Sequence, residues 1–353
     1  MGQVTPLMDA PAAHRRFRIE AEEDVGVLRR AVRLQTAGLP GLPEGDAELV
    51  ATELATNLLR HAGGGQVLTR ATGGGMELIA VDRGPGLSAP ARDSLAGARI
   101  TPAPGSPGGL GVGLATVRRR ARIFDYYSDD RGTVVLARLG AVPEAVAWVW
   151  GGVNVPLGGE GPSGDAFAVA ADGCLRAVLV DGIGHGPDAA AAAHAAILAL
   201  DHAALSTGTA PEAWLTGLVN GAHQELRGTR GAVLGACVID PVAGQAVFCG
   251  IGNINGRVHT ATSSPHLVSL PGTLGAEATP PRIRPAVHPW TRGATLIMAT
   301  DGIDTRWDPA EHPGLTRRHP TVVAAVLHRD HARGRDDAAI LVARATGTGQ
   351  ETT

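Results

Sequence analysis

Apolar residues in the first 140 positions follow the spacing of strands and helices in turn. Phe17 and Ile19 lie two apart, as in a half-buried strand, and every fourth residue from Val50 to Leu58 is apolar, as on one helix face. The glycines at 63–65 predict the end of that helix. The remaining patterns of this half predict a helix over 25–34, strands over 66–72, 76–82 and 133–139, a long loop over 88–107 and a helix over 108–123.

The second half shows more and shorter apolar runs. Asp172 and Gly173 separate two of them and predict a hairpin. The predicted strands are 146–153, 167–171, 175–180, 232–239, 246–251, 283–287, 295–299 and 338–343, and the predicted helices are 188–205, 211–227 and 321–331. Because strands and helices are mixed in both halves, the fold class is predicted to be α/β (α+β).

The chain length of 353 residues favours two domains, since a domain usually has roughly 100–200 residues. A change of pattern around 141–144 predicts the boundary. The expected organisation is a flexible N-terminus over 1–14, a first domain over 15–142, a second domain over 143–346 and a flexible tail over 347–353.

Composition excludes several classes of function. The chain contains no lysine, which rules out a Walker A phosphate lysine and a Schiff base. Its 31 basic and 34 acidic side chains are interspersed, with a net charge of −3, so no nucleic-acid partner is expected. Three isolated cysteines are typical of a soluble cytoplasmic protein, and no apolar stretch is long enough to predict a membrane span.

Candidate nucleotide-binding residues lie in the first half. Glu53, Asn57 and His61 share one helix face, where a carboxylate and an amide can hold a metal ion and a phosphate, although ordinary solvated faces have the same spacing. Asp82 ends a predicted strand and can either accept a hydrogen bond from an amine or shape a turn. The glycines at 108–113 precede a helix, whose N-terminal N–H groups attract phosphate.

Taken in order, three motifs of the first half resemble the N, G1 and G2 boxes of the GHKL ATPases: ELATN at 53–57, DRGPG at 82–86 and GGLGVGL at 108–114. The arginines at 118–120 make the first half most similar to the RsbT-like serine kinases, which regulate anti-sigma systems. The resemblance implies a GHKL (Bergerat) α/β sandwich that binds ATP with Mg²⁺. The resemblance implies that Glu53 is the general base, Asn57 the Mg²⁺ ligand and Asp82 the carboxylate that binds adenine. The implied nucleotide-binding glycines are Gly84, Gly86, Gly109, Gly111 and Gly113.

The second half places aspartates beside predicted strand ends, namely Asp165, Asp181, Asp301 and Asp336. Carboxylate oxygens are hard ligands that suit Mg²⁺ or Mn²⁺ better than zinc. A single Asp-Gly pair is more often a turn, as Asp172 with Gly173 is predicted to be. The recurrence of the pattern at several strand ends is therefore more informative than any one pair.

Four motifs of the second half resemble, in order, the metal motifs of the PPM-type serine/threonine phosphatases: SGD at 163–165, DGIGHG at 181–186, TDG at 300–302 and RDDAAILV at 335–342. The most similar branch is the bacterial SpoIIE and RsbX-like one. The resemblance implies an α-β-β-α sandwich with two Mn²⁺ or Mg²⁺ ions. It further implies that Asp181 bridges the ions, the Gly182 carbonyl is a ligand, Asp301 and Asp336 complete the second site, and Asp165 binds a metal or its water.

Two neighbouring residues have open roles. His185, four positions after Asp181, is either a general acid or a residue that packs at a helix entry. Asp337 either supports a third metal or caps the strand that follows it, and we favour the cap.

The two resemblances together imply a bifunctional partner-switching regulator. The expected phosphatase acts on a phosphorylated STAS-domain protein, and the expected kinase phosphorylates the same class of protein, within a system that includes a sigma factor or a stressosome-like assembly. The alternative is that the first domain only binds ATP and sequesters a partner, and thereby gates the phosphatase.

Overall fold

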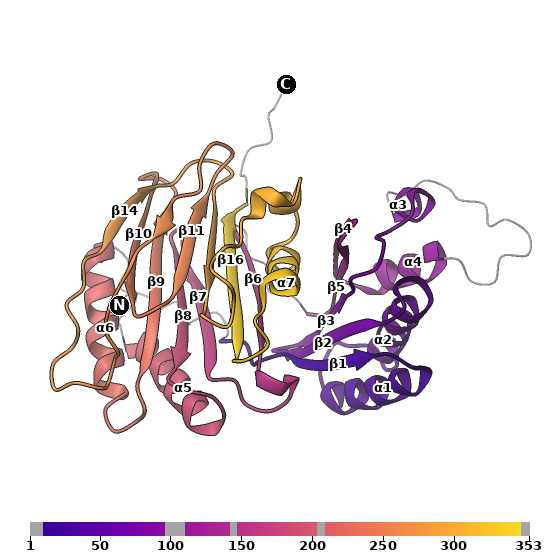
Figure 1. Cartoon of the computed structure of the whole chain (residues 1–353), viewed down its shortest axis with the longest axis horizontal. Coiled ribbons are helices and arrows are strands. Elements are labelled where there is room, and N and C mark those ends of the chain that lie inside the picture. The colour runs from indigo at the N-terminus through magenta and orange to yellow at the C-terminus, as the bar shows by residue number, and fades with distance from the viewer. Residues whose placement is uncertain (1–9, 96–109, 142–146, 203–208, 347–353) are drawn as a thin grey trace, which may run out of the picture. The chain divides into compact units, whose positions relative to one another are not determined.

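The computed structural model describes residues 10–95, 110–141, 147–202 and 209–346. The chain forms two compact units, one of His14–Glu144 and one that includes Ala145–Thr353 (Figure 1). Most of the ends expected to be flexible, and the expected boundary at 142–143, lie outside the described residues. His14, which we had placed in the flexible end, is fully buried, so the folded part begins before it.

The N-terminal unit is one antiparallel sheet with helices on one of its faces (Figure 1). The strand order is β1-β2-β3-β5-β4. Its elements are β1 (Arg15–Ile19), α1 (Glu22–Thr36), α2 (Asp46–Asn57), the π-helical turn η1 (Leu58–Ala62), β2 (Gly65–Thr72), β3 (Gly75–Val81), α3 (Ala89–Leu95), α4 (Leu110–Arg120), β4 (Ile123–Asp129) and β5 (Gly132–Gly140).

Alternating residues of β3 divide the two faces of this sheet. Met76 and Leu78 pack in the core with apolar residues of α1, α2 and α4. Glu77 points to the other face and is buried among three basic side chains. Its carboxylate lies 3.0 Å from His14 Nε2, 2.5 Å from Arg70 Nη2 and 2.5 Å from Arg138 Nε. Because Glu77 and its three basic partners fill the other face, the face covered by α2 and α4 is the one with room for a site.

The C-terminal unit contains two sheets and three longer helices. The first sheet has the order β13-β10-β9-β8-β7, with β14 also paired to β10, and the second has the order β12-β11-β15-β16-β6. Its elements are β6 (Trp148–Val155), η2 (Leu157–Gly159), β7 (Asp165–Ala171), β8 (Leu175–Gly182), α5 (Pro187–His202), α6 (Pro211–Glu225), β9 (Ala232–Asp240), β10 (Gln245–Ile251), β11 (Asn255–His259), β12 (His266–Leu267), β13 (Ser269–Leu270), β14 (Ala286–Pro289), β15 (Thr295–Ala299), η3 (Pro309–Glu311), η4 (Leu315–Arg317), α7 (Pro320–His331) and β16 (Ala338–Ala345).

The period of two along the strands explains the layers of this unit. On β8, Val178 and Val180 pack against α5 and α6, whereas Ala177 and Leu179 face the second sheet. Helix α7 packs on β16 and β6 of that second sheet. The resulting order, helices, sheet, sheet, helix, is consistent with the α-β-β-α sandwich expected of a PPM-type phosphatase (Figure 1).

The structure corrects several predicted elements. The helix that we expected to reach 123 ends at Arg120, and β4 follows it. The expected loop over 88–107 begins with helix α3, and its remainder lies outside the described residues. The expected strand over 283–287 is β14, which begins at Ala286, and β11, β12 and β13 were not predicted. Among the described residues, no helix combines the length and apolarity needed to cross a membrane.

Candidate functional sites

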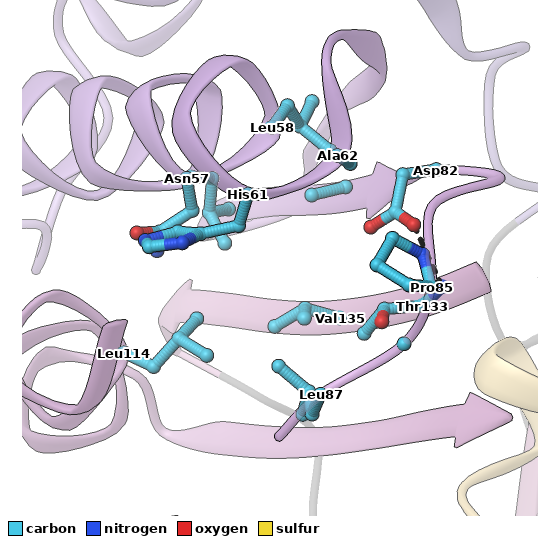
Figure 2. Close-up of a pocket in the computed structure, with 13 residues that line it drawn as sticks. Asn57, Leu58, His61, Ala62, Asp82, Pro85, Leu87, Leu114, Thr133 and Val135 are labelled. Carbon is cyan, nitrogen blue, oxygen red and sulfur yellow. Dashed lines mark hydrogen bonds between the residues drawn. The ribbon is translucent and has the colours of Figure 1, made fainter. Parts of the chain in front are cut away.

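A small cleft with a volume of about 40 Å³, open to solvent, lies in the N-terminal unit between α2, η1 and strands β3 and β5. Figure 2 shows Asp82 at one end of the cleft and Asn57 with His61 at the other. Between them the walls are apolar, formed by Leu54, Leu58, Ala80, Leu87, Leu114 and Val135. A carboxylate beside apolar walls suits a flat, partly apolar ring that carries a hydrogen-bond donor.

Asp82 is fixed by the backbone around it. Its Oδ1 accepts the N–H of Gly84 at 2.8 Å and the N–H of Thr133 at 3.0 Å. Gly86 has φ of 79°, and a Cβ there would lie 2.2 Å from the Asp129 carbonyl oxygen, so glycine is required for this turn. The two predicted glycines therefore shape the turn that presents Asp82, and the structure does not itself show them touching a ligand.

Helix α4 approaches α2 closely at Gly113. A Cβ there would lie 2.6 Å from Glu53 Oε2 and 3.4 Å from Asn57 Oδ1. The Nδ2 atom of Asn57 is buried and lacks a hydrogen-bond partner in the described part of the chain, which marks a place for a ligand or water. Gly111 lies in the first turn of α4, and Gly109 lies outside the described residues.

His61 extends from η1 toward Asn57, as Figure 2 shows. Burial and the charge of Arg60 lower the pKa of His61, which favours its neutral ring. The structure thus brings Asn57, His61 and Asp82 to one cleft. Glu53 lies beside Asn57 and next to Gly113, outside the lining of that cleft.

In the C-terminal unit, β7 and β8 bring Asp165 and Asp181 together as direct partners in the antiparallel ladder. Thr300 follows β15 and donates its hydroxyl to Asp165 Oδ2 at 2.7 Å. The same hydroxyl accepts the N–H of Ala339, in β16, at 2.9 Å. One side chain from the second sheet therefore fixes a carboxylate of the first.

Asp301 and Asp336 lie at the same end of the sandwich, just after β15 and just before β16. Asn253 Nδ2 donates to Asp301 Oδ2 at 2.7 Å. Asp336 Oδ1 accepts the N–H of Asp337 at 2.9 Å. The four aspartates predicted as ligands thus come from four strand ends that meet at one edge.

The electrostatics confirm that these carboxylates are close neighbours. Burial and the charge of Asp181 raise the pKa of Asp165 well above its usual value. Burial and the charges of Asp301 and Asp336 raise the pKa of Asp181 to about 7. Burial and the charge of Asp336 also raise the pKa of Asp301. The site therefore has an excess of negative charge that a cation would stabilise.

Asp337 binds backbone rather than other side chains. Its Oδ1 accepts the N–H of Leu157 and its Oδ2 accepts the N–H of Gly164, each at 2.6 Å. Gly164 in turn accepts the N–H of Gly182 at 2.8 Å, and a Cβ on Gly182 would lie 2.3 Å from the Ala189 carbonyl oxygen. Asp337 thus anchors the segment before β7, which favours a structural role over a third metal.

The residues present suit Mg²⁺ or Mn²⁺ by their chemistry, since all the candidate ligands are oxygen donors. Within the described ranges, however, no three His, Cys, Asp or Glu side chains are placed as a ready-made metal cage. Like charges at this edge repel one another, and a bound divalent cation would replace that repulsion with attraction. Asp165, Asp181, Asp301 and Asp336 are the residues that would hold such ions.

Thr300 and Asn253 were not identified as functional from the sequence. Thr300 stands inside the TDG motif and could have been found from it, but Asn253 follows β10 in a turn that no motif marked. His185 is exposed on the loop after Asp181, and no hydrogen bond to another described residue fixes its role. A catalytic role for His185 therefore stays a prediction.

Comparison with known proteins adds evidence for the C-terminal unit. Residues 171–346 match the family model described as Stage II sporulation protein E (SpoIIE). One solved structure comes from a study of the bacterial stressosome, described as a modular system that has been adapted to control secondary messenger signaling. A chain of that structure is 30% identical to this chain. The match covers 56% of this chain and 99% of that chain, with a TM-score of 0.50. No curated protein gives a significant match.

Two further solved structures are similar at lower identity. RsbX in complex with magnesium is 18% identical, covering 58% of this chain and 99% of that chain with a TM-score of 0.47. The phosphatase domain of the cell fate determinant SpoIIE from Bacillus subtilis is also 18% identical, covering 58% of this chain and 95% of that chain with a TM-score of 0.41.

Proposed function

Residues 171–346 of this chain form a SpoIIE-type phosphatase domain, and on this premise we propose that the protein removes phosphate from a serine or threonine of a STAS-domain partner. The observation that carries the proposal is the meeting of Asp165, Asp181, Asp301 and Asp336 at one edge of the sandwich. The similarity to a chain from a study of the bacterial stressosome supports a regulatory protein as the partner.

In this proposal the four aspartates hold two divalent cations, Mn²⁺ or Mg²⁺, and the Gly182 carbonyl is a further ligand. When bound, such ions supply Lewis-acid stabilisation of charge at phosphorus and help to activate water. Thr300 orients Asp165 through its 2.7 Å hydrogen bond, and Asn253 orients Asp301. Water forms the new bond to phosphorus as the serine oxygen leaves, so no protein nucleophile is needed.

The N-terminal unit is proposed to be a GHKL-type ATP-binding domain that acts as a serine kinase on the same class of partner. Asp82 would accept a hydrogen bond from the adenine amine, and the apolar walls would contact its ring. Asn57 would bind Mg²⁺ through its carbonyl oxygen, and Glu53 beside it would act as general base. The glycines at 109–113 would bind the phosphates at the start of α4.

A second candidate is a domain that binds ATP without transferring phosphate and gates the phosphatase. Glu53 is not among the residues that line the adenine cleft, and a general base must reach the hydroxyl that it deprotonates, so the kinase candidate requires that the phosphate end of ATP, near Asn57, lies within reach of Glu53.

Transfer of labelled phosphate separates the two candidates. The full chain, carrying Asp181→Asn so that its phosphatase site cannot remove the product, is incubated with the STAS-domain protein, Mg²⁺ and ATP labelled on the γ-phosphate. Label on the partner that disappears in Glu53→Gln supports the kinase. ATP binding without any transfer refutes the kinase and leaves the gating domain.

A further inference from the structure

A large groove lies in the C-terminal unit, lined by fifteen described residues and open to solvent, with a volume of about 1030 Å³. Its lining includes three arginines, Arg292, Arg317 and Arg344, and no aspartate or glutamate. The whole chain has a net charge of −3, so this concentration of positive charge is a local feature. Burial lowers the pKa of His259 in the same groove, with Asp308 acting in the opposite direction, so the arginines are the groove's permanently charged groups.

The groove is at the opposite end of the sandwich from the aspartates. β16 begins just after Asp336 and has Arg344 near its far end. At about 3.3 Å per residue, Arg344 lies roughly 25 Å along the strand from Asp336. β15 likewise starts beside the groove, after Arg292, and ends just before Asp301. A ligand in this groove would therefore not touch the catalytic aspartates.

The arginines differ in how they are held. Arg344 donates through Nη1 to the Thr316 carbonyl oxygen at 2.5 Å and through Nη2 to the Arg317 carbonyl oxygen at 3.3 Å. It therefore stabilises the turn that carries Arg317. The side chains of Arg292 and Arg317 are exposed. These two present charge to solvent, Arg292 from the turn before β15 and Arg317 from the end of η4, which suits recognition of two carboxylates.

Size and composition indicate the class of ligand. Small-molecule pockets usually measure about 300–1,000 Å³ and enclose most of their ligand, whereas this groove of about 1030 Å³ is at the upper end of that range and open to solvent. Single-stranded nucleic acid usually stacks on exposed aromatic rings. Trp290, the aromatic side chain in the lining, is only 6% exposed and offers no such platform. The remaining lining is threonine, glycine and small apolar residues, which suits an extended backbone.

We propose that this groove docks an extended acidic polypeptide segment of a partner protein, through Arg292 and Arg317. Binding there would hold a partner on the phosphatase unit without occupying the aspartate site. The proposal does not depend on hydrolysis, because the groove and the aspartates are at opposite ends of the unit.

The test measures binding of a fluorescein-labelled octaglutamate peptide to the full chain by anisotropy, against an uncharged octaserine peptide. The wild-type chain is expected to prefer octaglutamate, with affinity that falls as salt rises. The double variant Arg292→Glu with Arg317→Glu should weaken binding by roughly tenfold or more. Arg227→Glu, an exposed arginine outside the groove, is the matched control and should leave binding unchanged.

Hydrolysis of p-nitrophenyl phosphate with Mn²⁺ provides an independent readout of the fold, and the double variant should keep the wild-type rate. Equal binding of the two peptides, or equal weakening by Arg227→Glu, would overturn the proposal. Tighter binding of a single-stranded oligonucleotide at the same arginines would overturn it too. If the wild-type chain binds octaglutamate but does not hydrolyse p-nitrophenyl phosphate, the phosphatase is refuted and the docking groove is still supported.

Discussion

Asp337 accepts the backbone N–H of Gly164 at 2.6 Å, which ties the residue before β16 to the residue before β7. Its other oxygen accepts the N–H of Leu157 at the same distance. Gly164 directly precedes Asp165, so the position of Asp165 depends on a side chain that is distant in sequence. The aspartate edge is therefore built from backbone contacts as well as from the candidate ligands.

Asp337→Asn should lower phosphatase activity without removing a metal ligand. An amide group has one acceptor oxygen, so one of the two backbone N–H groups loses its partner and the 157–164 segment loosens. We expect a fall of about tenfold or more in kcat for p-nitrophenyl phosphate. Amide hydrogen exchange at Leu157 or Gly164 should become faster.

Asp240→Asn is the matched control, because Asp240 uses a single oxygen to accept the N–H groups of Val242 and Ala243 in a turn. It should change neither activity nor exchange in the 157–164 segment. Unchanged exchange in Asp337→Asn would show that the anchor is not needed.

Gly113→Ala should weaken ATP binding while leaving the N-terminal unit folded. The added Cβ would lie 2.6 Å from Glu53 Oε2, the end of a flexible side chain, so the Glu53 carboxylate must turn away from its place beside Asn57, whose own atoms lie 3.4 Å or more from that Cβ. Gly26→Ala is the control, since a Cβ there meets only Arg30 at 3.6 Å in α1. That change should stabilise the helix by about 0.5–1 kcal/mol. Urea unfolding measures the stability of each variant, and titration measures its affinity for ATP. Equal effects of the two changes on ATP binding would contradict the close approach of Gly113 to Glu53.

Asp82→Asn should abolish ATP binding and leave phosphatase activity unchanged. The amide oxygen can still accept the N–H groups of Gly84 and Thr133, so the turn should persist. What is lost is the negative charge and the second acceptor that faces the cleft. Calorimetric titration with ATP measures the effect, and a variant that binds ATP as tightly as the wild type would refute the adenine-binding role.

Glu77→Gln should destabilise the chain by about 3–5 kcal/mol, because it leaves Arg70 and Arg138 beside a neutral group in a buried place. Burial alone would raise the pKa of Glu77, but Arg138, Arg70 and His14 together hold it well below its usual value. A carboxyl group with a lowered folded-state pKa contributes stability above its unfolded pKa of about 4.3 and loses it as the pH falls through the folded value.

The difference in unfolding free energy between the wild type and Glu77→Gln should therefore stay constant from pH 7 to about pH 5 and shrink below about pH 4. Urea unfolding over this range measures it. A difference that grows as the pH falls would show that Glu77 is not held in its charged form.

Sequence patterns predicted the helix and the hairpin for different reasons. The helix through Val50 and Leu54 has one buried face, whereas the strands on either side of Asp172 and Gly173 are apolar runs buried on both faces. Strand β4 was missed because it is an edge strand whose residues are mostly half-buried, so it shows little alternation. The short strands β12 and β13 have two residues each, too few for any period.

The aspartate site was predicted more completely than its supports. A carboxylate at a strand end is visible in a motif, but the bonds from Thr300 to Asp165 and from Asn253 to Asp301 join residues distant in the chain. The contact of Gly113 with Glu53 is of the same kind, since only packing of two helices creates it. Long-range pairings of this sort depend on topology, which local patterns do not encode.

Release of orthophosphate from a serine-phosphorylated STAS-domain protein tests the central claim most directly. The wild-type chain with Mn²⁺ should release it, and chelation of the metal should stop the release. Asp181→Asn should reduce the rate by at least about a hundredfold, because it weakens the site shared by both ions. A rate in Asp181→Asn close to that of the wild type, or release that persists without divalent metal, would contradict the account.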